Sequence, residues 1–232
     1  MRKLSIVLGL ATLTACFEVD SSTCEETQDD PTVVDTGDTG DIDDEVIEDE
    51  PLVNPYAYVG EQHNLYLDCT RTLEARDARD VLKGLWSTCH FDGDDSFFDI
   101  YVDSYKLVGT SLYATGVNAD LDPEELEILA RADVIVRSYE PGEALLRLEW
   151  LEQVALQDED ASVPLLAALA TARASGAYWQ DEVDQDGNGG TRAKWWQILL
   201  ADAGGALVGG LVGGPAGGIA LGTTASTLVA KD

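Results

Sequence analysis

The sequence predicts a mainly α-helical domain that follows a disordered acidic tether and ends in a glycine-rich helical hairpin or kinked helix. Three observations support this fold class. Between residues 52 and 200, apolar residues recur at helical spacing behind residues that favour helix starts. The stretch from Glu18 to Glu50 is acidic and poor in apolar residues, and the stretch from Ala203 to Ala230 is rich in glycine and has no charged residue.

Residues 1–15 have the composition of a signal peptide. Arg2 and Lys3 form a basic start, and the apolar run from Leu4 to Leu13 follows it. This run is too short to span a bilayer, which takes about 20 apolar residues. It fits the apolar part of an export signal, which is removed from the mature protein.

The end of this segment, Leu13-Thr14-Ala15-Cys16, resembles the lipobox of bacterial lipoproteins. The resemblance implies that the chain is cut before Cys16 and that this cysteine carries lipid. Several acyl chains anchor a protein firmly, because each buried CH₂ contributes roughly 0.8 kcal/mol. In this family, Phe17 in place of Asp implies sorting to the outer membrane of a Gram-negative cell. The alternatives are an ordinary signal peptide with a chance cysteine and a soluble chain with an apolar start.

Residues 16–51 are expected to be a disordered tether. Fifteen Asp or Glu and no Lys or Arg lie between Glu18 and Glu50. Like charges repel, and the few apolar residues cannot form a core. Low-affinity Ca²⁺ binding by these carboxylates is the alternative. The formal net charge of the whole chain is −30, so we expect no nucleic-acid partner.

The first half of the expected domain, residues 52–200, is predicted less clearly than the second half. Helices are expected at 60–70 and 72–87. The stretch 97–112 is ambiguous, because its Tyr, Val, Ile and Phe content suits strands while its length and lack of a hairpin turn favour a helix.

In the second half of the domain, prolines indicate the helix starts. Asp122-Pro123 predicts a helix with Asp as N-cap and Pro in the first turn. Pro141 is expected to open another helix, with leucines on one face. Pro164 is expected to begin an alanine-rich helix that runs to about Trp179.

The four cysteines have different expected roles. Cys16 is assigned to lipid, and a disulfide between Cys69 and Cys89 is the favoured pairing in an oxidising compartment. Cys24 is then left in the tether, either free or paired with another chain. Metal binding by cysteine is not expected, because no C-x-x-C pair is present.

Candidate catalytic residues are limited to the two histidines, His63 and His90. A hydrolase built on either one is an alternative function, and His90 lies beside the oxygen-rich run 91–95. No HExxH or GxSxG signature accompanies them. We therefore expect a protein that is not an enzyme.

One segment suggests a metal site. Asp184, Asp186 and Asn188 stand at alternate positions before a glycine, as in the first half of an EF-hand loop. The twelfth position, where that loop needs Glu, is Trp195. A plain turn between helices is the favoured interpretation, and a weak Ca²⁺ site is the alternative. No other cofactor is expected.

The C-terminal segment 201–232 contains two rows of glycines with a spacing of four residues. In a helix each row forms a flat ridge that lets another helix approach closely. Pro215 divides the segment into halves 203–214 and 216–230, each roughly 20 Å long at 1.5 Å per residue. The rows are Gly205, Gly209, Gly213 and Gly217, and Gly210, Gly214, Gly218 and Gly222.

These rows resemble the glycine zipper of some outer-membrane lipoproteins, such as the surface-antigen group, and of pore-forming peptides. The resemblance implies helix packing, homo-oligomerisation or membrane insertion. A looser likeness to a set of exported bacterial proteins, which implies no activity, rests on three short segments: Val59-Gly60-x-x-His63-Asn64, Tyr178-Trp179 and Ala201-Asp202-Ala203-x-Gly205.

The sequence as a whole therefore predicts a lipid-anchored cell-envelope protein of structural or interaction type. A Ca²⁺-assisted extracellular binding module is the main alternative, ahead of the hydrolase.

Overall fold

The computed structural model of the chain describes residues 51–186 and 190–231, with side chains at 51–180 and 195–231. These residues are helical and include no strand, which confirms the mainly α fold class. Cys16, Cys24 and the tether lie outside them. Two short 3-10 helices join the α-helices: η1 (Asp95–Phe97) and η2 (Tyr105–Leu107). The α-helices are α1 (Ala57–Thr70), α2 (Ala78–Ser87), α3 (Phe98–Ser104), α4 (Leu112–Asn118), α5 (Pro123–Ser138), α6 (Pro141–Leu156), α7 (Val163–Asp186) and α8 (Gly190–Lys231).

The helices predicted from proline occur where the sequence places them. Asp122 caps α5 by accepting a hydrogen bond from the Glu125 backbone N–H, and Pro123 occupies the first turn. Helix α6 begins at Pro141. Helix α7 begins one residue before Pro164 and continues beyond Trp179.

The first half of the domain departs from the prediction in three places. The expected helix 72–87 begins only at Ala78, because Asp77 is extended and caps α2 through the Asp80 N–H. The stretch 97–112 forms the short helices α3 and η2 and then leaves helical geometry at Val108. Helix α4 was not predicted, and it depends on a distant residue: Asp133 accepts hydrogen bonds from the backbone of Leu112 and Tyr113.

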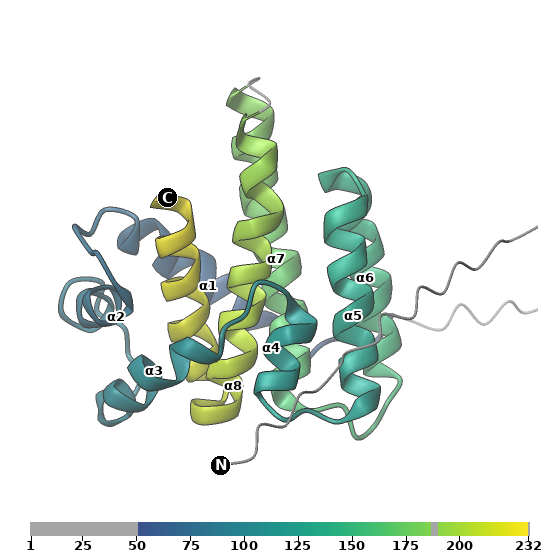
Figure 1. Cartoon of the computed structure of the whole chain (residues 1–232), viewed down its shortest axis with the longest axis horizontal. Coiled ribbons are helices and arrows are strands. Elements are labelled where there is room, and N and C mark those ends of the chain that lie inside the picture. The colour runs from purple at the N-terminus through teal and green to yellow at the C-terminus, as the bar shows by residue number, and fades with distance from the viewer. Residues whose placement is uncertain (1–50, 187–189, 232) are drawn as a thin grey trace, which may run out of the picture. The chain divides into compact units, whose positions relative to one another are not determined.

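Helix α8 is a helical hairpin. Gly213 has φ −141° and ψ 15°, and Gly214 has φ 61° and ψ −154°, so the helix is broken at these two residues. Glycine suits a positive φ because it has no Cβ. We call residues 190–212 the first arm and residues 215–231 the second arm. Figure 1 shows the two arms running in opposite directions, with the turn between them at the lower end of α8.

The arms touch backbone to backbone. A Cβ on Gly209 would lie 1.9 Å from the Gly217 carbonyl oxygen, and a Cβ on Gly205 would lie 2.4 Å from the Leu221 carbonyl oxygen. Real Cβ atoms do not approach so closely, so only glycine permits this separation of the arms. The hairpin, which the sequence predicts as one of two possible forms, is therefore the form that the chain adopts.

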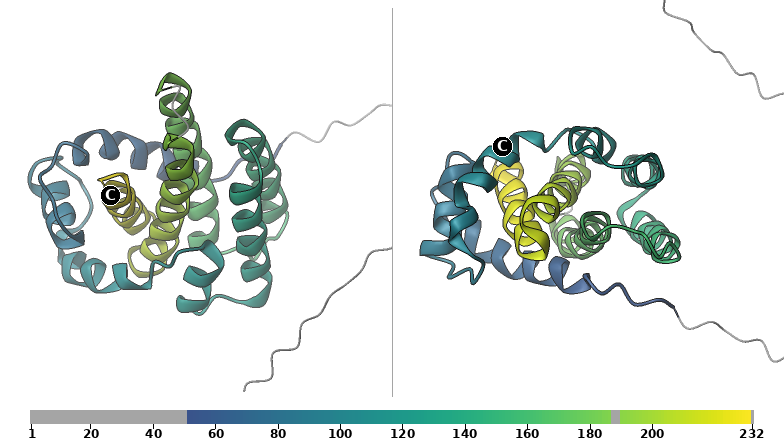
Figure 2. Two further views of the ribbon diagram at one scale, coloured as in Figure 1. Left: turned by 45° about the horizontal axis from the view of Figure 1, so that its top comes forward. Right: turned by 90° about the horizontal axis from the view of Figure 1, so that it is seen from below.

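The second arm occupies the middle of the described structure. Figure 2 shows it surrounded by α1, α2, α3, α7 and the first arm. Residues 217–227 of this arm are all buried, and Ile219 and Leu221 belong to a core cluster with Val59 and Leu82. The first arm continues without a break across residues 200 and 201, so the glycine segment forms part of the domain core.

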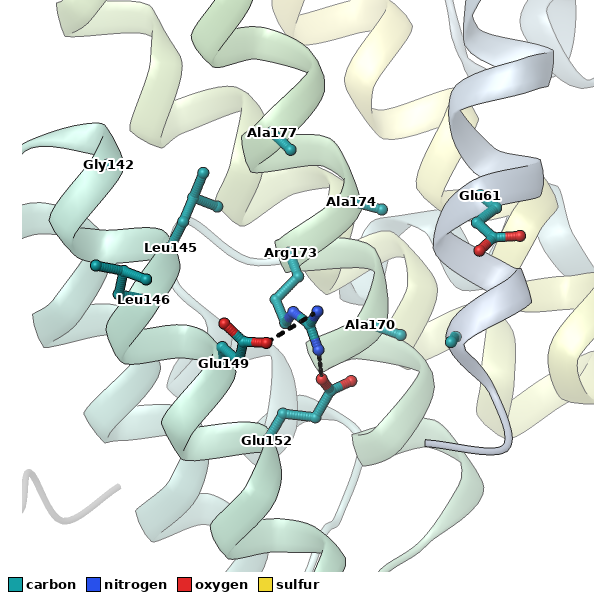
Figure 3. Close-up of a pocket in the computed structure, with 11 residues that line it drawn as sticks. Glu61, Gly142, Leu145, Leu146, Glu149, Glu152, Ala170, Arg173, Ala174 and Ala177 are labelled. Atoms are coloured by element: carbon teal, nitrogen blue, oxygen red, sulfur yellow. Dashed lines mark hydrogen bonds and ion pairs between the residues drawn. The ribbon is translucent and has the colours of Figure 1, made fainter. Parts of the chain in front are cut away.

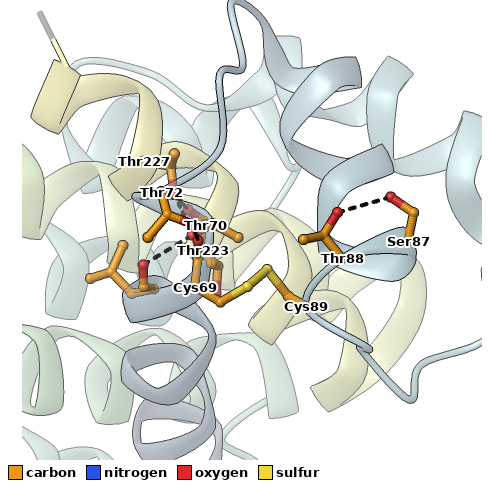
Figure 4. Close-up of a disulfide and its surroundings, with 9 residues drawn as sticks. Cys69, Thr70, Thr72, Ser87, Thr88, Cys89, Thr223 and Thr227 are labelled. Atoms are coloured by element: carbon orange, nitrogen blue, oxygen red, sulfur yellow. Dashed lines mark hydrogen bonds between the residues drawn. A yellow bond between two sulfur atoms is a disulfide. The ribbon is translucent and has the colours of Figure 1, made fainter.

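A disulfide joins Cys69, at the end of α1, to Cys89, just after α2 (Figure 4). This is the pairing that the sequence favours. Next to it, the Thr70 and Thr227 hydroxyls lie 2.7 Å apart, so that a hydrogen bond ties the end of α1 to the second arm. The disulfide therefore holds α2 against the same end of α1 that packs on the hairpin.

Replacing both Cys69 and Cys89 with alanine is expected to lower the free energy of unfolding by about 3 kcal/mol. The bridge spans 20 residues, and closing a loop of this size removes conformational entropy from the unfolded chain. Urea denaturation followed by circular dichroism measures the change, and the reduced wild-type chain should lose the same amount. Equal urea midpoints for the double variant and the oxidised chain would show that the bridge adds no stability.

Candidate functional site

The most unusual group in the core is a set of polar side chains from four helical segments, which we call the Asp202 cluster. It consists of His63 from α1, Ser175 and Trp179 from α7, Asp202 from the first arm, and Ser226 from the second arm. All five side chains are buried. The three short segments Val59–Asn64, Tyr178-Trp179 and Ala201–Gly205 meet here, because they contain His63, Trp179 and Asp202.

Asp202 is the centre of the cluster. The Ser175 hydroxyl donates a hydrogen bond to Asp202 Oδ2, and His63 Nε2 lies 3.7 Å from the same oxygen. His63 Nδ1 donates to Asn64 Oδ1 at 3.0 Å, because an amide oxygen only accepts. This bond orients the imidazole so that Nε2 points to the carboxyl group.

Burial raises the pKa of Asp202 from 3.8 to about 6. Desolvation is the largest cause, because it disfavours the charged form. His63, Ser175, Ser226 and Trp179 act in the opposite direction and lower the pKa. Asp202 is the sole charged residue between Trp195 and Ala230, so this part of the hairpin carries one titratable acid, and it is fully buried.

Several buried polar atoms of the cluster make no hydrogen bond within the part of the chain that the structure describes. They are His63 Nε2, Trp179 Nε1, Asp202 Oδ1 and Ser226 Oγ, together with the nearby Thr171 Oγ1. Thr171, Ser175 and Trp179 follow one another at four-residue spacing, which places them on one face of α7. Trp179 and Ser226 nevertheless lie near enough to Asp202 to lower its pKa, so the cluster groups its polar atoms around one carboxyl.

Glycines allow the helices of the cluster to approach one another. A Cβ on Gly60 would lie 2.5 Å from the Ala170 carbonyl oxygen, so α1 rests directly on the backbone of α7. A Cβ on Gly222 would lie 3.1 Å from both the Asp202 carbonyl oxygen and His63 Cδ2. The positions of His63 and Asp202 therefore depend on small residues in both neighbouring helices.

The geometry does not provide an activated serine. Asp202 lies between Ser175 and His63, whereas nucleophilic catalysis needs the histidine in contact with the hydroxyl so that it can accept its proton. All three side chains are also inaccessible to solvent. The second histidine, His90, lies elsewhere, as an exposed residue with φ 57° in the turn after α2.

The expected Ca²⁺ ligands are only partly described. Asp184 and Asp186 lie on the helical backbone of the last turn of α7, whereas an EF-hand supplies its ligands from a loop. Asn188 lies outside the described residues. Among the side chains that the structure describes, no three His, Cys, Asp or Glu residues are grouped as metal ligands.

The glycine rows contact the rest of the chain itself. Gly205, Gly209 and Gly217 face the opposite arm, and Gly218 faces Ala206. Other members approach neighbouring helices: Gly210 meets Pro164, and Gly213 meets Tyr101. Of the eight ridge glycines, Gly214 alone borders open space. The ridges therefore pack the two arms together and against the domain.

The hairpin bears on the expected membrane association. By length and composition, α8 is the one described helix that could cross a membrane, although most of its apolar window is buried in the domain. The turn at Gly213 and Gly214 divides this length into two arms. The hairpin could therefore insert into a bilayer only if it first lost its packing against the other helices of the domain.

A hollow of about 450 Å³ lies between α1, α6 and α7. Figure 3 shows the Arg173 side chain of α7 between Glu149 and Glu152 of α6, with Glu61 of α1 on the other side of the hollow. Arg173 makes ion pairs with both α6 acids, and the buried Glu152 also accepts a hydrogen bond from Asn54 at 2.5 Å. Arg173 thus joins α6 to α7 and is already neutralised by acids of the chain.

A larger and more apolar groove of about 750 Å³ lies on the outer face of α5 and α6. We call it the α5–α6 groove. Three of its apolar residues are exposed: Val134 by 59%, Leu146 by 68% and Trp150 by 59%. Tyr139 closes one end, where its ring lies 3.8 Å from the Arg147 guanidinium carbon. The groove is therefore an apolar surface that the described helices leave exposed.

Sequence reasoning missed both the groove and the centre of the cluster. Leu148, Leu151 and Ala155 form the buried face of α6, as the sequence predicts. Leu146 and Trp150 lie on another face of the same helix with a spacing of four residues, which was the available signal for a second apolar surface. For Asp202 the signal was a single acid in an otherwise uncharged segment of 36 residues, 195–230.

Comparison of the chain with protein-family models, with curated proteins and with solved structures finds no match. The functional inferences below therefore rest on the sequence and on the geometry of the described residues.

Proposed function

We propose that this chain is a lipid-anchored protein of the cell envelope whose helical domain is a non-catalytic binding module. In this proposal Cys16 carries lipid in the outer membrane of a Gram-negative bacterium. The acidic residues 16–51 serve as a tether, and the domain binds another protein through the α5–α6 groove. The glycine-rich hairpin packs the centre of the domain.

The α5–α6 groove is the observation that carries the binding function. Trp150, Leu146 and Val134 form an exposed apolar strip that lines one groove on α5 and α6. Exposed apolar patches with polar rims are typical of protein interaction sites, and exposed tryptophan is enriched among residues that dominate binding energy. Glu127, Arg131, Glu143 and Arg147 supply the polar rim.

The other candidate functions have less support from the geometry. The Ca²⁺-assisted module would need ligands from 184–188, of which Asp184 and Asp186 are on a helix. A hydrolase built on His63 would need that residue to be accessible, and it is fully buried. His90 is exposed but lies in the turn after α2, outside the Asp202 cluster. Insertion of the hairpin into a bilayer would require both arms to leave their contacts.

Lipid attachment is tested by Cys16→Ser. The expected result is that the wild-type protein incorporates labelled palmitate and partitions into detergent, while the variant does neither and is recovered in the aqueous phase. Several acyl chains make anchoring effectively complete, so the difference should be close to all or none. Cys24→Ser is the matched control and should behave as wild type. Palmitate label that persists in Cys16→Ser would contradict the anchor.

The binding function is tested with a photo-crosslinking amino acid in living cells. Placed at Trp150, it is expected to give covalent adducts with a bound protein. Placed at Leu65 on α1, which is exposed by 61%, it should give none and serves as the control. If position 150 yields no adduct in cells, or if both positions yield the same set, the groove is not a specific binding site.

A further inference from the structure

The occupant of the α5–α6 groove can be identified from the charges on its rim. On α5 the Arg131 guanidinium pairs with Glu127, and on α6 Arg147 pairs with Glu143 at 2.7 Å. The groove thus carries two acids and two bases, each pair with a spacing of four residues. This face is electrically balanced in a chain whose formal net charge is −30.

A balanced face determines which partners can approach. A strongly basic partner would be attracted to the acidic parts of the domain rather than to this groove, because the groove itself has no excess of negative charge. Two copies of this acidic chain would repel each other over most orientations. The α5–α6 groove is a face on which that repulsion is small and apolar area is available.

The rim is also complementary to itself. A two-fold axis through the midpoint of Glu127 and Arg131, perpendicular to α5, would place Glu127 opposite Arg131 of a second copy and Arg131 opposite its Glu127. Contacts of this reciprocal kind define the interface of a symmetric dimer. The Glu127–Arg131 ion pair of each copy can then be replaced by two ion pairs across the axis, and no charge is left unpaired.

The same axis passes close to the apolar residues. Helices α5 and α6 are antiparallel and meet at Tyr139 and Glu140, and each residue advances the chain by 1.5 Å. Residue 129, the midpoint of the α5 pair, is therefore level with Trp150 on α6. A two-fold axis there brings the Trp150 rings of both copies together, with Leu146 and Val134 beside them.

From these features we infer that the groove binds a second copy of this chain. The inference rests on the proposed binding function and names its partner. Two helices from each copy then form a four-helix contact, in which the apolar strip is covered and the rim charges are paired. The lipid anchor would raise the local concentration of the chain on the membrane and favour this association.

Sedimentation velocity of the purified mature chain tests the dimer. The chain carries Cys16→Ser and Cys24→Ser, so that neither lipid nor an intermolecular disulfide contributes. A concentration-dependent doubling of mass is expected. Trp150→Ser should weaken the dimer by at least about a hundredfold, as for a central tryptophan, whereas Leu65→Ser on α1 should leave it unchanged. Helical circular dichroism shows whether each variant is folded.

Charge exchange provides a sharper test. Glu127→Arg alone puts arginines opposite arginines, and Arg131→Glu alone puts glutamates opposite glutamates, so each variant should lose at least about tenfold in self-affinity. An equimolar mixture of the two should form a heterodimer, because every facing pair is then of opposite sign. A purely structural role for the intrahelical pair would not produce recovery on mixing.

The outcomes separate this inference from the proposed function. A wild-type chain that stays monomeric at all concentrations, or a dimer that Trp150→Ser leaves intact, overturns the second-copy inference. If the cellular adduct at position 150 then has a mass other than twice that of the chain, the groove binds a different protein and the proposed function stands. Absence of any adduct removes both.

Discussion

Gly209→Ala is expected to lower the free energy of unfolding by about 3 kcal/mol or more, because among the described glycines its added Cβ would make the shortest contact. The new Cβ would lie 1.9 Å from the Gly217 carbonyl oxygen and 2.3 Å from its carbonyl carbon. A backbone carbonyl cannot rotate out of the way as a side chain can. The arms must therefore separate along their length, which opens the central packing of the domain.

The sign of this effect is decided by two opposing contributions. Alanine in a helix is favoured over glycine by about 1 kcal/mol, so the substitution would stabilise an arm that faced solvent or lipid. Overpacking of a well-filled core costs 1–3 kcal/mol and occasionally more. With contact to backbone rather than to a mobile side chain, the second contribution dominates, and the melting temperature should fall by roughly 10 °C.

Gly204→Ala is the matched control, because it lies in the same arm and has the same gain in helix propensity. Its Cβ would meet only side-chain atoms, with Thr115 Oγ1 at 3.3 Å and Val108 Cγ1 at 3.4 Å. The expected change is within about 1 kcal/mol of zero. Thermal melting of both variants in water measures the difference. Equal stability of Gly209→Ala and Gly204→Ala would falsify the internal role of the glycine ridge.

Asp202→Asn is expected to stabilise the protein at pH 8 by up to about 3 kcal/mol. Burial raises the pKa of Asp202 to about 6 in the folded chain, against 3.8 for the unperturbed group. Each unit of pKa difference corresponds to about 1.4 kcal/mol. The asparagine can keep an oxygen at the Oδ2 position that accepts from Ser175, and it carries no charge.

The pH dependence has a definite sign. Between pH 4 and pH 6 the folded state binds more protons at Asp202 than the unfolded state does, because the folded pKa is the higher one. The contribution of this residue to stability is therefore fully present below about pH 4 and is lost as the pH rises through about 6. In Asp202→Asn this dependence should be absent, so the stability difference between variant and wild type should grow over the same interval.

Asp133→Asn is the contrasting control. Asp133 is also buried, but its carboxylate accepts hydrogen bonds from the backbone N–H groups of Leu112 (2.9 Å) and Tyr113 (3.0 Å) at the start of α4. Asparagine offers one acceptor oxygen instead of two, so this variant should lose about 1–2 kcal/mol. Urea denaturation at several pH values measures both variants. A destabilised Asp202→Asn at pH 8 would show that the ionised carboxylate is favourable in the core.

Three aspartates, Asp122, Asp133 and Asp202, show how far sequence reasoning extends. Asp122 was predicted as a helix cap because its partner, the Glu125 N–H, is three residues away. Asp133 acts on α4 across about twenty residues of chain, and Asp202 meets His63 across most of the domain. Local patterns report interactions within about four residues, so they predict the cap and miss the other two roles.

The α5–α6 groove illustrates the same limit on a surface. The spacing of Leu148 and Leu151 predicts that α6 has a buried face, but the positions of Leu146 and Trp150 do not reveal whether a second helix covers them. Helix α6 packs on α7 through one face, and no described helix reaches its outer one. Which apolar residues become core and which remain exposed depends on where the neighbouring helices lie.

The sequence by itself determines the helical class, the helix starts at Pro123 and Pro141, and the apolar, glycine-rich character of the C-terminal segment. These features follow from capping, periodicity and composition, which act along the chain. Only the tertiary structure decides that Gly209 and Gly217 face each other across a turn at Gly213 and Gly214, and that the single acid of the hairpin meets His63. Close contact between two backbones is a property of the pair of helices, and neither arm alone contains the information that selects it.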